Sequence, residues 1–149
     1  MRVRAAMVPA LLAFELSSST GQPPTPDLAS RERHLRNIRQ LTFGGENAEA
    51  YFSRDGSHLI FQSTRDGSAC DQIYTMTIDG TDLHRVSTGT GRTTCGYFYP
   101  DGREILFAST HKARPQCPPK PTFERGYVWP IYSTYDIYRA DADGSNLRP

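Results

Sequence analysis

The chain of 149 residues lacks any excess of charge and any long apolar segment. Seventeen Lys and Arg side chains face sixteen Asp and Glu side chains, which leaves a net charge of +1. This balance argues against the strong basic field that attracts proteins to nucleic acid or to anionic membranes. The most apolar stretch, residues 5–14, is also too short to cross a bilayer. We therefore expect no nucleic-acid partner, and no membrane insertion once the N-terminal segment described below is removed.

Motifs for metals and for covalent catalysis are missing as well. The three cysteines include no Cys-x-x-Cys pair, and the four histidines are not spaced as metal ligands. No Gly-x-Ser-x-Gly pentapeptide, which carries the nucleophile of α/β-hydrolases, occurs in the chain. The sequence thus predicts no catalytic residue, no metal and no cofactor.

The N-terminal segment has the pattern of an export signal. Arg2 and Arg4 precede the apolar residues 5–14, and small residues stand at Ser19 and Gly21. This order predicts a signal peptide over residues 1–21 and a periplasmic or secreted protein, with a disordered tail as the alternative. Residues 22–36 read as a Pro-rich linker that contains a short helix before Leu35.

An internal repeat organises the remainder of the chain. Two blocks recur at an offset of 46, and two further blocks recur at an offset of 64 because the second copy has 18 additional residues after His111. The paired blocks are 51–56 with 97–102, 59–64 with 105–110, 71–74 with 135–138, and 79–83 with 143–147. A base period of about 45 residues is typical of the four-stranded blade of a β-propeller.

Each copy divides into four short strands, which in the first copy lie near residues 50–53, 58–63, 72–78 and 83–87. Asp-Gly pairs separate the first strand from the second and the third from the fourth, as in tight hairpin turns. We therefore predict an all-β fold of four-stranded antiparallel blades. The partial propeller covers residues 37–149, with blade 1 at about 48–87 and blade 2 at about 94–149.

The two ends of the repeat predict an incomplete ring. Residues 37–42 align with residues 82–87, so the N-terminal side supplies an orphan fourth strand of the kind that closes a propeller. The second copy stops within its own fourth strand, at residues 147–149. Because two blades cannot bury their faces in a ring, we expect an N-terminal fragment whose missing blades belong to the rest of the parent chain.

The blade motifs resemble the WD-like repeat of TolB-type β-propellers. The resemblance rests on residues 52–56 (Phe-Ser-Arg-Asp-Gly), 59–61 (Leu-Ile-Phe), 65–67 (Arg-Asp-Gly), 73–74 (Ile-Tyr) and 79–80 (Asp-Gly). It implies an exported, non-catalytic scaffold that binds a protein or peptide partner. The alternative is the gating propeller of a prolyl-oligopeptidase-type serine peptidase, and a carbohydrate-binding propeller is a third possibility.

The three cysteines are expected on one face of the ring, in loops. Cys70 falls between the second and third strands of blade 1, Cys95 before the first strand of blade 2, and Cys117 in the insertion. In an oxidising compartment an odd count predicts one disulfide and one spare thiol. We expect a bridge from Cys117, with Cys95 as the first choice of partner and Cys70 as the second. Three unpaired thiols are the other outcome.

The insertion at residues 111–135 is the strongest candidate for recognition. Its partner-binding candidates are Arg125, Tyr127, Trp129 and Tyr132. Aromatic side chains and arginine are the preferred anchors of binding surfaces, and long loops on a rigid scaffold often carry function. The alternative is a flap whose aromatic rings only cover the edge of the blade.

Overall fold

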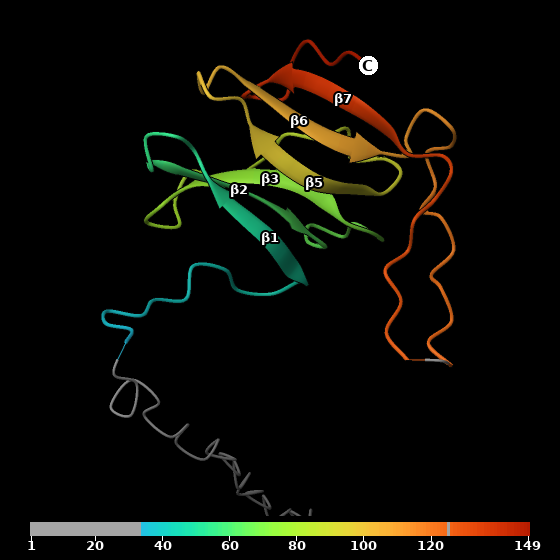
Figure 1. Cartoon of the computed structure of the whole chain (residues 1–149), viewed down its shortest axis with the longest axis horizontal. Helices are drawn as coiled ribbons and strands as arrows, with labels where there is room; N and C mark the ends of the chain where they lie inside the picture. Colours follow the sequence, from blue (N-terminus) through green and yellow to red (C-terminus); the bar gives the residue numbers. More distant parts are fainter. Residues whose placement is uncertain (1–33, 125) are drawn as a thin grey trace, which may run out of the picture. The chain divides into compact units, whose positions relative to one another are not determined.

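Two antiparallel sheets make up the fold in the computed structural model, which describes residues 34–124 and 126–149 (Figure 1). The first sheet follows chain order, and its strands are β1 (Asn47–Phe52), β2 (His58–Ser63), β3 (Gln72–Thr77) and β4 (His84–Arg85). The second contains β5 (Thr93–Phe98), β6 (Glu104–Ser109) and β7 (Asp136–Asp141), again in chain order. The predicted all-β fold with antiparallel meander blades is confirmed. The predicted signal peptide and the helix before Leu35 lie outside the described residues.

Both sheets carry the same irregularity in their first strand. The pairing of β1 with β2 shifts between Ala48 and Tyr51, and the pairing of β5 with β6 shifts between Thr94 and Tyr97. Glu49 and Cys95 lie within these shifts and have φ angles of 51° and 55°. Each first strand therefore contains a β-bulge at the same point of the repeat.

The Asp-Gly turns form as the sequence predicts. Asp55 accepts hydrogen bonds from the Ser57 amide (3.1 Å) and the Ser53 hydroxyl (2.6 Å). Asp79 is bonded in the same way by the Thr81 amide (3.0 Å) and the Thr77 hydroxyl. These bonds stabilise the charged carboxylates and lower the pKa of both Asp55 and Asp79 to about 2. The two carboxylates thus stabilise the turns.

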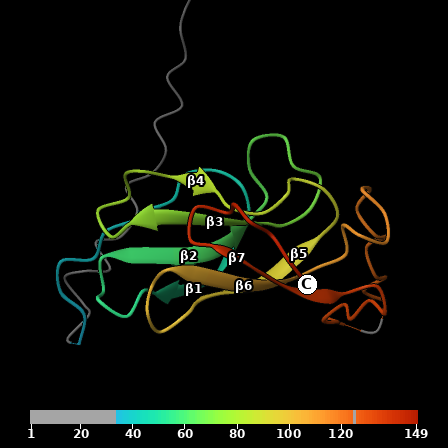
Figure 2. The same ribbon diagram turned by 90° about the horizontal axis from the view of Figure 1, so that it is seen from above.

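The main core lies between the two sheets, which face each other as two layers (Figures 1 and 2). In the strands of the first sheet, side chains point alternately to the two faces, and one of these two sets enters the main core. The second sheet contributes Phe107 and Tyr138, which are 0% and 3% exposed. β2 is buried on both faces because its two sets of side chains enter different clusters. The buried members are Ile60, Ile73, Val86, Ile105, Phe107, Tyr138 and Ala140.

A second cluster covers the outer face of the first sheet. Leu59, Phe61, Tyr74 and Met76 are buried there, and Leu41 packs against them. The expected orphan strand at residues 37–42 does not form: in the described part of the chain this segment has no strand assignment. The reason is that a strand needs a neighbour to complete its ladder, and the described residues place none beside this segment.

The second sheet is open where the next blade of a propeller would lie. Arg139 and Arg148 exchange two backbone hydrogen bonds of 2.8 Å, so the predicted fourth strand begins beside β7. Ile137 on the free face of β7 is 72% exposed, whereas the equivalent Ile73 of the first sheet is 0% exposed. Over residues 34–124 and 126–149 the blades therefore do not close a ring.

Candidate binding cleft

The insertion leaves the sheet after β6 and returns at β7 (Figure 1). Its root is held by a disulfide between Cys70 and Cys117, whose Cα atoms are 5.9 Å apart. The Gly91 amide also donates a hydrogen bond of 2.7 Å to the Pro115 carbonyl. The expected bridge from Cys117 is present, and it ties the insertion of blade 2 to a loop of blade 1.

The first choice of partner, Cys95, was wrong. Cys95 lies within the bulge of β5 and not in a loop, and it is the exposed free thiol among the described cysteines. Gly91 explains why Cys70 is used instead. Its carbonyl oxygen lies 3.0 Å from the Cys70 sulfur while its amide binds Pro115, so Cys70 and the root of the insertion meet at the same residue.

A cleft of about 320 Å³ lies between the insertion and the ends of β1, β2 and β5. We call it the insertion cleft. The blades contribute Glu46, Ala48, Gln62, Asp71, Arg92 and Thr94, and the insertion contributes Lys120, Pro121, Phe123, Tyr127, Val128, Trp129, Pro130 and Tyr135. Two of the four predicted partner-binding residues, Tyr127 and Trp129, are therefore in its wall.

An aromatic row forms the insertion side of the cleft. The Phe123 and Tyr127 rings are stacked with centroids 6.4 Å apart, and the Trp129 ring meets Tyr127 edge-on at 6.5 Å. These side chains are 54%, 79% and 48% exposed in the same order. The row is therefore an exposed apolar surface, and it is not buried against the edge of the blade.

The floor of the cleft contains an ion pair between Arg92 and Asp71. Their side chains are only 14% and 15% exposed. Burial raises the pKa of Asp71, and the neighbouring charge of Arg92 opposes that rise. The Arg92 Nε atom is enclosed and has no hydrogen-bond acceptor among the described residues. The pair therefore leaves one buried donor without a partner among the described residues.

Tyr135 and Tyr132 make different contributions to the insertion. Burial raises the pKa of Tyr135 to about 12, so its hydroxyl in the cleft stays neutral at physiological pH. Tyr132 donates a hydrogen bond of 2.6 Å to the Pro119 carbonyl, which braces one arm of the insertion against the other. Tyr132 does not line the cleft, so its predicted role in binding stays a prediction. The remaining candidate, Arg125, lies outside the described residues.

Sequence reasoning missed the floor of the cleft. Asp71 follows a cysteine in one blade and Arg92 precedes the first strand of the next, and their spacing of 21 residues corresponds to no motif. One signal was available, the order of the strands in the chain. In a propeller, the loops between second and third strands lie on the same face as the loops between successive blades. That rule could have placed Asp71 and Arg92 beside the insertion.

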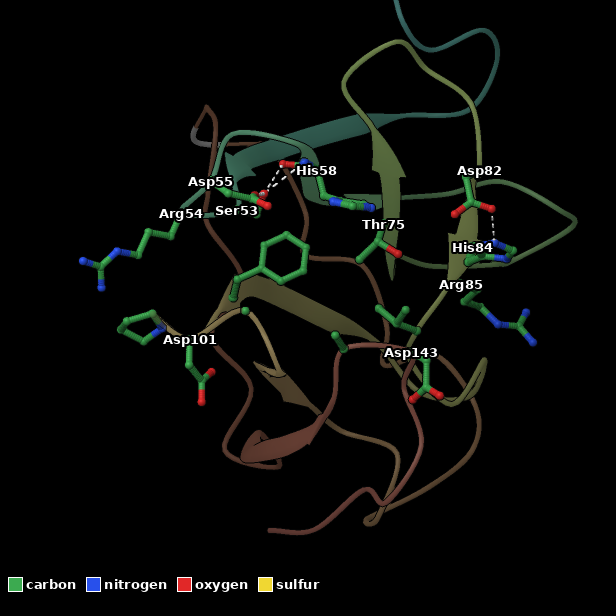
Figure 3. Close-up of a pocket in the computed structure, with 15 residues that line it drawn as sticks. Ser53, Arg54, Asp55, His58, Thr75, Asp82, His84, Arg85, Asp101 and Asp143 are labelled. Atoms are coloured by element: carbon green, nitrogen blue, oxygen red, sulfur yellow. Dashed lines mark hydrogen bonds and ion pairs between the residues drawn. The ribbon is translucent and has the colours of Figure 1, made fainter.

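A larger cavity of about 970 Å³ lies where the turns of both blades meet, at the other ends of the strands (Figure 3). Its carboxylates are engaged locally. Asp82 contacts the His84 ring at 2.7 Å, and Asp143 accepts bonds from the Ser145 amide and hydroxyl. No group of three or more His, Cys, Asp or Glu residues suited to a metal ion occurs within the described ranges.

Solved structures provide the comparison for this architecture. A protein assigned as TolB from Agrobacterium tumefaciens matches with a TM-score of 0.52 and 21% identity, over 72% of this chain and 34% of that one. The fold resembles that of TolB propeller blades. TolB from Acinetobacter baumannii matches with a TM-score of 0.48 and 22% identity, over 81% of this chain and 24% of that one. Neither a protein-family model nor a curated protein matches the sequence.

The TolB-like fold agrees with the resemblance that the repeat motifs predicted. This chain spans about a third of the Agrobacterium TolB that it matches. Among the residues that the structure describes, no helix is suited to span a membrane.

Proposed function

We propose that this chain belongs to an exported, TolB-like propeller that binds a protein or peptide partner in the insertion cleft, without catalysing a reaction. The observation that supports this most directly is the aromatic row of Phe123, Tyr127 and Trp129. These rings are substantially exposed, yet they stand on a root that a disulfide fixes to the blades. A rigid scaffold that presents exposed aromatic rings loses little entropy on binding.

The disulfide also supports export. Disulfides form and persist in oxidising compartments and are rare in the cytosol. The bridge between Cys70 and Cys117 joins two blades, so a reducing compartment would release the insertion from the first blade. The periplasm or the extracellular space is therefore the compartment in which the cleft keeps its shape.

A fluorescence titration can test this function, because Trp129 is the single tryptophan of the chain and lies in the cleft. Peptides selected from a random displayed library on the oxidised protein should change the Trp129 emission in a saturable way. Tyr127→Ala should weaken this binding by tenfold or more, in the range of an aromatic hot spot, on the order of 2 kcal/mol. Tyr127 is so exposed that its replacement should not affect folding.

Phe43→Ala is the matched control, because Phe43 is also an exposed aromatic residue (78%) but does not line the cleft. It should leave the affinity unchanged. Selection of no peptide, or of peptides whose affinity is the same in Tyr127→Ala, would contradict the proposed function.

A further inference from the structure

The hydrogen-bonding groups of the insertion cleft indicate which kind of peptide it takes. Side-chain donors of four insertion residues line it, and no hydrogen bond joins them to a residue that the structure describes. They are Lys120 Nζ, the Tyr127 and Tyr135 hydroxyls, and Trp129 Nε1. The cleft therefore offers many donors to whatever occupies it.

Two of the side chains that can accept hydrogen bonds in the cleft already do so. Asp71 accepts from Arg92, and the Gln62 side-chain oxygen accepts from the Thr94 hydroxyl at 2.9 Å. Of the carboxylate and amide side chains that line the cleft, only Glu46 remains without such a bond within the described ranges. A ligand rich in its own donors would find few free side-chain acceptors here, and a buried donor without a partner costs free energy.

We propose that the cleft binds a proline-rich segment in the polyproline II conformation. This inference rests on the proposed function and specifies its partner. A polyproline II segment has no internal hydrogen bonds, so all its carbonyl groups can accept, and its prolines have no N–H to satisfy. It matches a site that has many donors and few acceptors. Sugar hydroxyls donate as well as accept, so a carbohydrate matches the same site less well.

The aromatic row fits the same ligand. Its rings follow one another at 6.4 Å and 6.5 Å, which is close to the rise of two residues of an extended peptide, about 6–7 Å. Pyrrolidine rings pack well on aromatic faces, and the hydroxyl of Tyr127 and the indole N–H of Trp129 lie within the same row to bond carbonyl groups. Extended proline-rich segments also lose little conformational entropy on binding, because they are already ordered.

Three probes separate this proposal from its alternatives, with Trp129 emission as the readout. The first is an oligoproline peptide blocked at both ends. The second has the same length, with alternate prolines replaced by alanine, which keeps every carbonyl but adds N–H groups and flexibility. The third is a neutral oligosaccharide. We expect saturable binding of the oligoproline, at least tenfold weaker binding of the alanine-containing peptide, and no binding of the sugar.

Tyr127→Phe tests the role of the donor because it keeps the ring and removes only the hydroxyl. It should weaken oligoproline binding about fivefold, the effect of one neutral hydrogen bond. Phe43→Ala should have no effect. Equal affinity for the two peptides would overturn the polyproline II proposal but leave peptide binding intact. Binding of the sugar without either peptide, or without any library peptide, would overturn the proposed function as well.

Discussion

Leu41 and Val86, 45 positions apart in the chain, make the same contact on two successive blades. Val86 belongs to the buried cluster that contains Ile105, Phe107, Tyr138 and Ala140 of the second sheet. Leu41 packs against Leu59, Phe61, Tyr74 and Met76, which are the equivalent positions of the first sheet. The segment around Leu41 thus packs on blade 1 in the way that the fourth strand of blade 1 packs on blade 2. No β-ladder forms in that segment.

The same relationship predicts which glycines cannot be replaced. A Cβ atom on Gly144 would lie 2.5 Å from the Val86 carbonyl oxygen, whereas one on Gly102 would meet nothing within 4 Å. Both glycines have positive φ angles, 87° and 71°. Gly102→Ala should cost about 1 kcal/mol for the left-handed backbone. Gly144→Ala should cost at least about 2 kcal/mol more because it pushes the blades apart. Urea denaturation measures both, and equal costs would contradict this packing.

The disulfide should contribute substantially to stability. Replacing both Cys70 and Cys117 by Ser opens a loop of 47 residues and should lower the free energy of unfolding by about 2–4 kcal/mol. Cys95→Ser is the control and should change stability little, since the free thiol is exposed. Peptide mapping after alkylation without reduction should find Cys95 alone modified. A modified Cys70 with a bonded Cys95 would refute the pairing.

Lowering the pH should destabilise the Asp-Gly turns within a narrow pH range. The pKa of Asp55 and of Asp79 is lowered from 3.8 to about 2 by the hydrogen bonds to the charged carboxylates. The stabilisation is therefore fully present above pH 3.8 and is lost as the pH falls towards 2. Asp55→Asn combined with Asp79→Asn should flatten the decline in thermal midpoint between pH 4 and pH 2. An unchanged slope in the double variant would show that these carboxylates do not titrate as described.

The core between the sheets should respond strongly to truncation. Phe107→Ala removes a ring that is 0% exposed and should cost about 3–5 kcal/mol. Ile137→Ala is the control, because Ile137 lies on the free face of β7 and is 72% exposed. It should change the free energy of unfolding by less than about 0.5 kcal/mol. Similar losses in the two variants would mean that the free face is covered in solution.

The strands could be predicted from the sequence because local rules determine them. The internal repeat and the Asp-Gly turns located β2 at residues 58–63 and β3 within one residue of its observed end. The partner of Cys117 could not be predicted in this way, since it depends on the approach of Gly91 to Cys70 in space. The pair of Arg92 and Asp71 was missed for the same reason. The sequence placed Leu41 at the correct point of the repeat, but a ladder also requires a neighbouring strand.

The bulges at Glu49 and Cys95 have a consequence for solubility. Within the described part of the molecule, β1 and β5 are edge strands, and each has its bulge about midway along. A foreign strand that docked along either edge would find its hydrogen bonds out of step after the bulge. Fibril growth needs an uninterrupted row of such bonds, so the bulges oppose amyloid-like stacking along β1 and β5.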